Sequence, residues 1–283
     1  MTFPLFPLPI PTLLREIADP PKQLTIRGAY PDESFKFLAV VGSRTYSPYG
    51  RQVCEKLIAG LRGYPVVIVS GLALGIDGIA HQSALDAGLL TIAVPGSGLD
   101  DAVLYPASHR TLAQKILESG GALVSEFDPL WKPRPESFPQ RNRIMAGMCH
   151  AVLVVEAEER SGTLITSRLA REYNRDVLAV PGPIYSDTSK GPHMLIKKGA
   201  ALISGSKDIL EALGIEEKVE GQPRLRFDLS DDEQAMVALL RTPLPRDELV
   251  RSCGRTVTEA NILLSSLELK GVIEERIGKV YVV

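Results

Sequence analysis

A Gly-Ser-Arg tripeptide is the first group of residues whose types fit ligand binding. Gly42, Ser43 and Arg44 directly follow the apolar run KFLAVV and precede a segment with the pattern of a helix, GRQVCEKLIAGL. A glycine lets a ligand approach the backbone, a serine supplies a hydroxyl, and the free amides of a helix start attract anions. The arginine offers a planar fork for a phosphate or a guanine edge. The tripeptide indicates a phosphate-bearing polymer, although a plain strand-to-helix turn with a surface arginine would have the same residues.

The sharpest cluster lies in the proline-punctuated segment FDPLWKPRPESFPQRNRIMAG. A loop of this length between packed elements is more often functional than structural. Its aromatic ring can stack on a base, and its two guanidiniums and one amide at a helix start suit phosphates and unpaired base edges. The residues predicted to bind nucleic acid here are Phe138, Arg141, Asn142 and Arg143. The structural alternative is that the arginines pair with Glu126 or Glu136.

Two further loops carry small residues after apolar runs. Ser161, Gly162 and Thr163 stand at the start of a predicted helix and could form a hydroxyl-rich anion nest. Gly71 opens the segment SGLALGIDGIAHQSAL, whose glycines relax the turn before a helix. We expect these four residues to line the same site.

Signatures of nucleotide-dependent or hydrolytic catalysis are incomplete. No Gly-Lys-Ser or Gly-Lys-Thr follows SGLALGID, and its spacing is not the dinucleotide fingerprint, so neither ATP nor NAD is indicated as a cofactor. Asp77 and His81 lie four residues apart and could join Ser70 in a triad, but the chain has no G-x-S-x-G motif to present the nucleophile. A structural pair of Asp77 and His81 is favoured, so no catalytic residue is assigned.

The elements that must position these loops form an α/β sheet. Buried strands are expected at KFLAVVG, VVIVSG, TIAVPG, ALVSE, AVLVVEA and VLAVPG. Continuous hydrophobicity means that both faces are covered, and the intervals are long enough for crossover helices, so the sheet is parallel with helices on both faces. A Rossmann-like architecture follows. Its ligands lie beyond the carboxyl ends of the strands, where the Gly-Ser-Arg and Arg-Asn-Arg loops occur.

The chain divides into four predicted segments. Residues 1–30 are a proline-rich lead-in, an extended arm or the remnant of a further domain, and residues 31–213 are the Rossmann-like domain. Residues 214–227 are a polar linker. Residues 228–283 have the winged-helix pattern of three short helices and a hairpin, beginning with a Ser230–Glu233 capping box. Seven Lys or Arg stand against ten Asp or Glu there, which favours a protein contact or a structural role over DNA contact.

Composition indicates in which compartment the protein works, but it does not show whether the protein binds nucleic acid. The 283 residues carry a formal net charge of −2, so a nucleic-acid partner would need a local basic cluster. No apolar run is long enough to span a membrane, and the start MTFPLFPLPIPTLL lacks the basic region of a signal peptide. The three cysteines are far apart, which suits free thiols and a reducing compartment. A cytoplasmic protein without a disulfide or metal framework is expected.

The motifs taken together resemble one family. VGSR, SGLALGID followed by AH, the LYP after GSGLDD, SE, FPQRNRIMAG, VVEA, SGTLIT and AVPGPI occur in the order and spacing of the DNA-processing protein A family, also called DprA or Smf. The likeness covers roughly residues 3–214, and the C-terminal segment is similar to the winged-helix domain of many members.

The resemblance implies a homodimer without catalytic activity that binds single-stranded DNA during natural transformation and loads the RecA recombinase onto it. Single-strand-binding protein is a further candidate partner. By position, Gly42 to Arg44, Arg141 to Arg143 and Ser161 to Thr163 match the family's pocket motifs. Leu74 departs from the arginine that is usual there, and His109 departs from the common asparagine.

An enzyme is the competing hypothesis. The nucleotide phosphoribohydrolases that resemble lysine decarboxylases share a Rossmann-like fold and use a PGGxGTxxE loop. PGSGLDD and SGTLIT echo that loop in part, but the glutamate at the required spacing is missing. This interpretation predicts release of a free base from a nucleotide.

Overall fold

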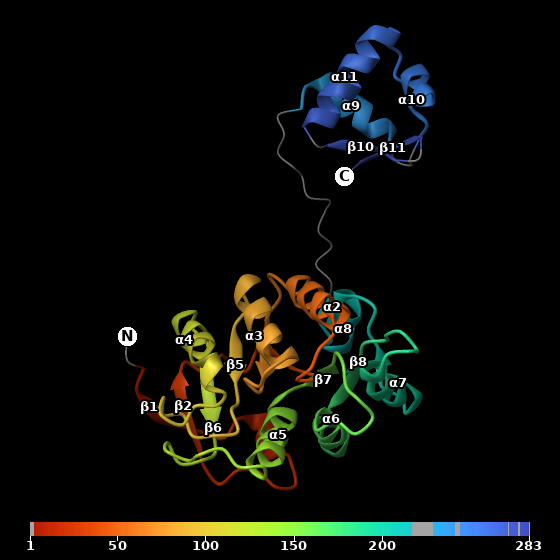
Figure 1. Ribbon diagram of the computed structural model, residues 1–283. Helices are drawn as coiled ribbons and strands as arrows, with labels where there is room; N and C mark the ends of the chain where they lie inside the picture. The colour runs from red at the N-terminus through yellow and green to blue at the C-terminus, as the bar shows by residue number, and fades with distance from the viewer. Residues whose placement is uncertain (1–2, 217–228, 241–243, 271, 277, 283) are drawn as a thin grey trace. The chain divides into compact units, whose positions relative to one another are not determined.

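The computed structural model describes residues 3–216, 229–240, 244–270, 272–276 and 278–282. They belong to two compact units, Met1–Glu217 and Lys218–Val283, which are considered separately (Figure 1). The predicted linker at 214–227 lies for the most part outside the described residues.

A nine-stranded sheet forms the centre of the first unit. The strands are β1 (Leu5–Leu8), β2 (Leu24–Gly28), β3 (Lys36–Val41), β4 (Val66–Ser70), β5 (Thr91–Ala93), β6 (Ala122–Ser125), β7 (Ala151–Val154), β8 (Asp176–Ala179) and β9 (Ala201–Leu202). Their spatial order is β1-β2-β6-β5-β4-β3-β7-β8-β9, and all neighbours from β6 to β9 pair in parallel. The six predicted strands and the Rossmann-like class are confirmed.

The predicted lead-in differs from the expected arm or domain remnant, because it extends this same sheet. β1 pairs antiparallel with β2, and β2 pairs antiparallel with β6 through the register Gly28↔Ala122. Leu24 and Ile26 of β2 are buried in the main core. Residue 31 therefore does not mark a boundary between structural units, since burial of these side chains joins the lead-in to the sheet.

Helices cover both faces of the sheet (Figure 1). One face carries α2 (Pro48–Ala59), α3 (Ile76–Asp86), α4 (Arg110–Glu118) and α8 (Ser206–Ala212), and the other carries α1 (Thr12–Arg15), α5 (Ser137–Met148), α6 (Thr163–Glu172) and α7 (Lys190–Lys197). Short 3₁₀ turns lie at Ala107–His109 and Asp187–Ser189. Along β3, Phe37 packs into one core while Leu38 packs into the other, which explains the continuous apolar run.

The strand order reverses between β3 and β7. From β3 the chain runs outward through β4, β5 and β6, and it returns to the other side of β3 as β7. The loops after β3 and β7 therefore diverge from one point at the carboxyl edge of the sheet. Such a switch point is where open α/β sheets bind ligands.

The second unit has the predicted winged-helix pattern. It contains α9 (Asp231–Leu239), α10 (Arg246–Ser252), α11 (Val257–Leu269), β10 (Ile273–Arg276) and β11 (Lys279–Val282). Capping boxes begin two of the helices, Ser230 with Glu233 at α9 and Thr256 with Glu259 at α11. Its core includes Leu249, Leu264 and Val280, so helices and wing share one hydrophobic cluster.

The ionisation of Glu233 makes the stability of the second unit depend on pH. Its carboxylate accepts 2.7 Å hydrogen bonds from the Lys270 ammonium and the Ser266 hydroxyl and a 2.9 Å bond from the Ser230 amide. These partners lower the pKa of Glu233 to about 2. Because the folded pKa lies below the ordinary value, the stabilisation is complete above about pH 4.5 and is lost as the pH falls toward 2.

Acid is therefore expected to loosen the winged helix through Glu233. Between pH 4.5 and 2, amides of α9 and α11 should lose hydrogen-exchange protection, after correction for intrinsic rates, more steeply in the wild type than in Glu233→Gln. Mass spectrometry of peptides from the intact chain measures this. Glu248→Gln, at an exposed glutamate of α10, serves as the control. Equal pH dependence in wild type and Glu233→Gln would contradict the assignment.

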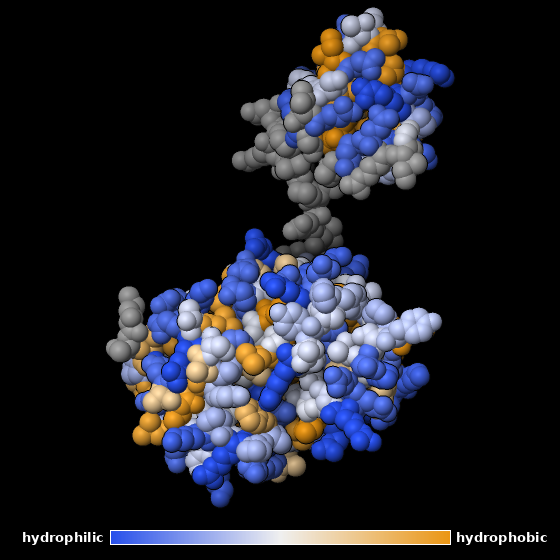
Figure 2. Space-filling model, viewed as in Figure 1, coloured by the Kyte–Doolittle hydropathy of each residue, from blue (hydrophilic) through white to orange (hydrophobic). Residues whose placement is uncertain are grey.

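Hydrophilic and hydrophobic residues are intermixed over the face of the first unit in Figure 2. Among the described residues, no helix combines the length and apolar character needed to cross a membrane.

Candidate nucleic-acid interface

A pocket opens at the switch point, bounded by the loops after β3 and β7 and by the start of α5. Its volume is about 590 Å³. Nine of the eleven residues predicted to bind nucleic acid line it: Gly42, Ser43, Arg44, Phe138, Arg141, Asn142, Ser161, Gly162 and Thr163. Three loops that are distant in sequence thus meet in one cavity.

Arg44 lies exposed at the mouth of the pocket. Its guanidinium carbon is 5.1 Å from the centroid of the Phe138 ring, a cation–π arrangement. Tyr105 packs against the same ring edge-on, with the centroids 6.0 Å apart. Arg44 has no hydrogen bond or ion pair to any residue that the structure describes. One face of a charged, planar group is therefore supported by an aromatic ring, and its donors remain available for a ligand.

Arg141 supplies a second cation from inside the pocket wall, where only 5% of the residue is exposed. Its Nη1 donates to the Val94 carbonyl at 2.5 Å and its Nε donates to Oδ1 of Asn142 at 3.1 Å. Within the described part of the chain, its Nη2 has no hydrogen-bond partner. The guanidinium is thus held in a fixed orientation with donor capacity left over.

The carboxylate of Asp77 balances the buried charge. Burial lowers the pKa of Arg141, and the charge of Asp77 opposes that change. Burial likewise raises the pKa of Asp77, whereas Arg141 and the amides of Ala73 and Gly71 hold it down. The two amide bonds to Asp77 measure 3.4 and 3.0 Å. Two buried opposite charges compensate each other, as burial of either one requires.

Gly71 makes room for Arg141, although it does not itself line the pocket. A Cβ atom on Gly71 would lie 1.7 Å from Nη1 of Arg141. Any side chain at residue 71 would force the guanidinium out of its position. This predicted binding residue therefore shapes the site from behind the arginine.

Gly75 locks the loop after β4 against the Gly-Ser-Arg loop. Its φ of +83° lies in the region that favours glycine, and a Cβ there would be 2.3 Å from the Ser43 carbonyl oxygen and 2.6 Å from the Arg44 Cα. The Ile76 amide donates to the same Ser43 carbonyl at 3.2 Å. The backbone position of Arg44 is therefore set by direct backbone contact between two loops.

The predicted hydroxyl groups and the predicted anion nest are used inside the loops. The Ser43 hydroxyl donates to the Thr45 carbonyl at 2.7 Å, and the Thr163 hydroxyl donates to the Gly42 carbonyl at 3.0 Å. At the start of α6, the Thr163 amide donates to the Ser161 hydroxyl, and the next two amides donate to the carbonyls of Ser161 and Gly162. These hydroxyl groups and amides therefore stabilise the loops that form the pocket wall. The hydrogen-bond donors available to a ligand are those of Arg44 and Arg141.

Arg143 lies outside the pocket. Its Nη2 donates to the carboxylate of Glu126, and its Nη1 donates to the Asp19 carbonyl at 3.0 Å. This is the structural alternative considered for the cluster. Both arginines were predicted to bind, although residues two apart on a helix do not face the same way.

Glu156 is a site residue that the sequence motifs did not single out. It is buried and accepts from the Ser47 amide at 2.9 Å, the Ser47 hydroxyl at 2.6 Å and the Thr188 hydroxyl at 2.9 Å. It thereby ties the end of the Gly-Ser-Arg loop to the loop before α7. An acidic residue after an apolar strand was visible in VVEA, but its partners are 109 and 32 residues away.

The triad considered from sequence does not form. The Ser70 hydroxyl donates to the Val40 carbonyl at 2.6 Å, and His81 Nδ1 lies 2.7 Å from the Thr91 hydroxyl. Burial lowers the pKa of His81 to about 3, so the ring is neutral. The Ser70 hydroxyl and His81 Nδ1 are thus bound to structural partners, and no Ser-His-Asp relay is formed.

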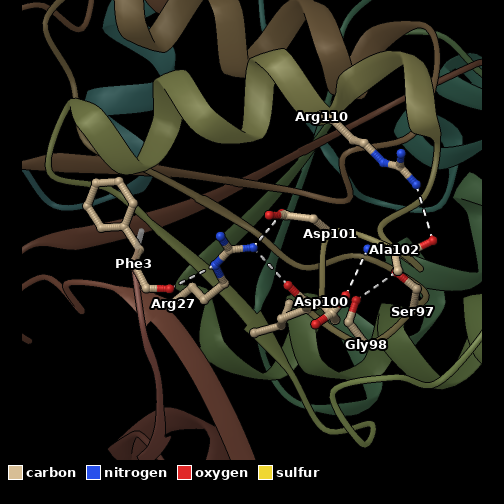
Figure 3. A network of polar contacts seen from close by, with 9 residues as sticks. Phe3, Arg27, Ser97, Gly98, Asp100, Asp101, Ala102 and Arg110 are labelled. Carbon is tan, nitrogen blue, oxygen red and sulfur yellow. Dashed lines mark hydrogen bonds and ion pairs between the residues drawn. The ribbon is translucent and has the colours of Figure 1, made fainter. Parts of the chain in front are cut away.

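The PGSGLDD loop after β5 is held to neighbouring segments by polar contacts (Figure 3). Arg27 reaches it with hydrogen bonds of 3.0 Å to the Leu99 carbonyl and 2.6 Å to Asp101, and with a third of 3.2 Å to the Phe3 carbonyl. Ser97 is fully buried, and the Gly98 amide donates to the Trp131 carbonyl at 2.9 Å. Residues 95–99 of this loop are buried, and its backbone is bonded to other segments of its own chain, which disfavours the nucleotide-loop interpretation.

Comparison with known proteins agrees with this arrangement. Residues 8–214 match the family model of DNA recombination-mediator protein A, and residues 220–279 match that of the DprA winged helix domain. Protein Smf of Escherichia coli is 44% identical over 89% of this chain and 66% of its own length. DNA processing protein DprA of Streptococcus pneumoniae is 46% identical over 70% of this chain and 68% of its own length. The chain thus spans about two thirds of each relative.

Two solved structures are also similar. DNA processing protein A from Streptococcus pneumoniae superposes with a TM-score of 0.68 at 44% identity, covering 74% of each chain. The Helicobacter pylori protein superposes with a TM-score of 0.66 at 30% identity, covering 75% of this chain and 96% of that one, and its structure is described as giving insight into a unique single-stranded DNA binding mode. With family models matched across both units, the chain belongs to the DNA recombination-mediator protein A family and carries the DprA winged helix domain.

Proposed function

We propose that the chain binds single-stranded DNA in the switch-point pocket, protects the strand and delivers it to the RecA recombinase. A role in DNA processing is the coarser conclusion that its relatives support. The observation that carries the finer proposal is the Arg44 guanidinium, unpaired among the described residues and supported on the Phe138 ring beside the buried cation of Arg141. The proposed setting is a cytoplasmic homodimer without catalytic activity, with single-strand-binding protein as a further partner.

The shape of the pocket favours a single strand over a duplex. Phe138 is only partly exposed, and Arg141 is set within the wall. A base reaches these groups only if it turns away from a complementary strand, and bases in a duplex are stacked and paired. Arg44, at the mouth, is placed for the backbone phosphate. The single-strand binding described for the Helicobacter pylori relative is consistent with this proposal.

The winged helix is proposed to contact protein or to serve a structural role. Three of its cations are already paired: Arg246 with Glu268 at 2.8 Å, Lys270 with Glu233 at 2.7 Å, and Arg255 with Asp232. Phosphate binding requires cations that can replace counterions, and paired cations do so poorly.

Fluorescence anisotropy with labelled oligonucleotides tests the proposed binding. We expect a thymine oligonucleotide to bind at least about tenfold more tightly than a duplex of equal length, because only the free strand can present its bases. The logarithm of affinity should fall against the logarithm of salt concentration with a slope of roughly −1 to −2, since about two phosphates are neutralised. Equal affinity for both forms would argue against the pocket as a single-strand site.

Delivery to the recombinase needs a separate experiment. RecA filament formation is followed on single-stranded DNA that is coated with single-strand-binding protein, with and without this chain. Faster filament formation is expected, and Arg44→Glu should abolish the acceleration. Release of free base from nucleoside monophosphates at high protein concentration would instead revive the phosphoribohydrolase alternative.

A further inference from the structure

We propose that a second cavity, the α3 groove, binds the base that neighbours the pocket-bound nucleotide on the same DNA strand. The groove has a volume of about 440 Å³ and is lined by residues that include Arg44, Tyr46, Arg51, Leu74, Gln82 and His109. The inference rests on the proposed function and specifies where the strand goes after it leaves the pocket.

Arg44 joins the two cavities, because it lines both of them. The close approach of Gly75 to the Arg44 backbone brings Leu74, the residue before it, into the groove that Arg44 also lines, whereas Phe138 lines the pocket. A phosphate bound at Arg44 would therefore have one adjoining nucleotide in the pocket and the other at the groove.

The groove offers apolar surfaces of the kind on which bases stack. Leu74 is 47% exposed and Tyr46 is 40% exposed, although both are large hydrophobic side chains. Exposed apolar groups beside a polar groove are typical of binding sites, and an aromatic ring accepts any base because every base has a π face. These two side chains can hold a base between the loops after β3 and β4.

His109 adds a hydrogen-bonding group at the floor of the groove. Its Nδ1 lies 2.8 Å from the Leu72 carbonyl, which can only accept, so Nδ1 carries the proton and donates. When Nδ1 donates, the lone pair of Nε2 can accept, and Nε2 has no hydrogen-bond partner within the described residues. An amino or imino group of a base can supply the missing donor.

The charge of the groove selects a base over a phosphate. Arg51 pairs with Glu55 at 2.8 Å, and the Asp86 carboxylate accepts from the Gln82 amide at 2.8 Å. Because Arg51 and Glu55 cancel each other, the remaining carboxylate of Asp86 would repel a phosphate and is tolerated by an uncharged base. Among the described arginines that line the groove, Arg44 is the one without an ion pair, and it lies at the junction of the two cavities.

A length series of thymine oligonucleotides tests the inference by anisotropy. For the shortest strands that saturate the pocket, Leu74→Asn should bind as the wild type does, because it adds no charge beside Arg44. For longer strands it should bind about five to ten times more weakly, because one stacked base is lost. Leu74→Met should restore the affinity. Leu130→Asn is the control, since Leu130 is 67% exposed and lines neither cavity.

Crosslinking locates the base directly. Irradiation of a 5-iododeoxyuridine strand bound to the intact chain is expected to label the tryptic peptide 45–51, which contains Tyr46, and Leu74→Asn should reduce that label. The α3 groove is ruled out if Leu74→Asn matches the wild type at every length and peptide 45–51 stays unlabelled while single strands still bind. If the wild type binds no single strand at all, the proposed function has failed as well.

Discussion

Replacing Arg44 by glutamate is expected to weaken single-strand affinity about a hundredfold, equivalent to roughly 3 kcal/mol. The change removes a guanidinium that has no hydrogen-bond or ion-pair partner in the described chain and puts a carboxylate at the place where a phosphate would bind. Stability should hardly change, because the side chain is exposed. Anisotropy measures the affinity, and the salt slope should become less steep by about 0.7 for the phosphate no longer neutralised.

Arg15→Glu is the matched control for Arg44→Glu. Arg15 is also exposed, but it lies on α1 and lines neither the pocket nor the α3 groove. Its affinity should stay within about twofold of the wild type, because an exposed charge outside the site is screened by salt. Arg44→Lys should fall between the two, since it keeps the charge and loses the planar fork. A similar loss in Arg44→Glu and Arg15→Glu would indicate general electrostatics rather than a site.

Gly75→Ala is expected to destabilise the first unit by about 3 to 5 kcal/mol. Residue 75 has a φ of +83°, and forcing an alanine into such a conformation costs about 1–3 kcal/mol. The new methyl group would also meet backbone atoms of Ser43 and Arg44 at 2.3 and 2.6 Å, and backbone cannot move aside as a flexible side chain can. Urea unfolding measures the loss of stability.

The same substitution should reduce single-strand affinity even under conditions where the chain is folded, because it displaces the Arg44 backbone. Gly88→Ala separates the two causes: Gly88 has a φ of +69°, but a Cβ there would meet no atom within 4 Å. It should cost about 1 kcal/mol and leave affinity unchanged. If the two alanine variants lose equal stability, the contact between the loops contributes nothing.

The strands and the loops that follow them could be predicted because their signals are local. Six apolar runs of β-branched residues became β3 to β8, and the loops after β3 and β7 reached the switch point as parallel topology requires. The capping box at Ser230 was likewise readable over four residues and begins α9. Three strands were missed. Pro7 interrupts the pattern of the edge strand β1, the burial of β2 depends on its pairing with β6, and the edge strand β9 has only two residues.

Individual site residues were harder to predict, because their roles depend on partners that are far away in sequence. The sequence did not distinguish Arg141 from Arg143, yet Arg141 is buried near Asp77 and Arg143 pairs with Glu126. The Ser43 hydroxyl suggested a ligand contact and instead closes its own loop. Helical periodicity could have separated the two arginines, but nothing local indicated the charge balance with Asp77.

The amino-acid sequence was sufficient for the fold class, the winged helix and the three loops that form the pocket, because hydrophobic periodicity and short motifs act over a few residues. Only the packed chain decided which arginine donors stay free, which hydroxyl groups are consumed, and that Arg44 belongs to two cavities at once. Those properties arise where backbone segments from β3, β4 and β7 come within contact distance. No pattern along a single segment records the distances between segments, and so the chemistry of Arg44 and Arg141 became visible only in three dimensions.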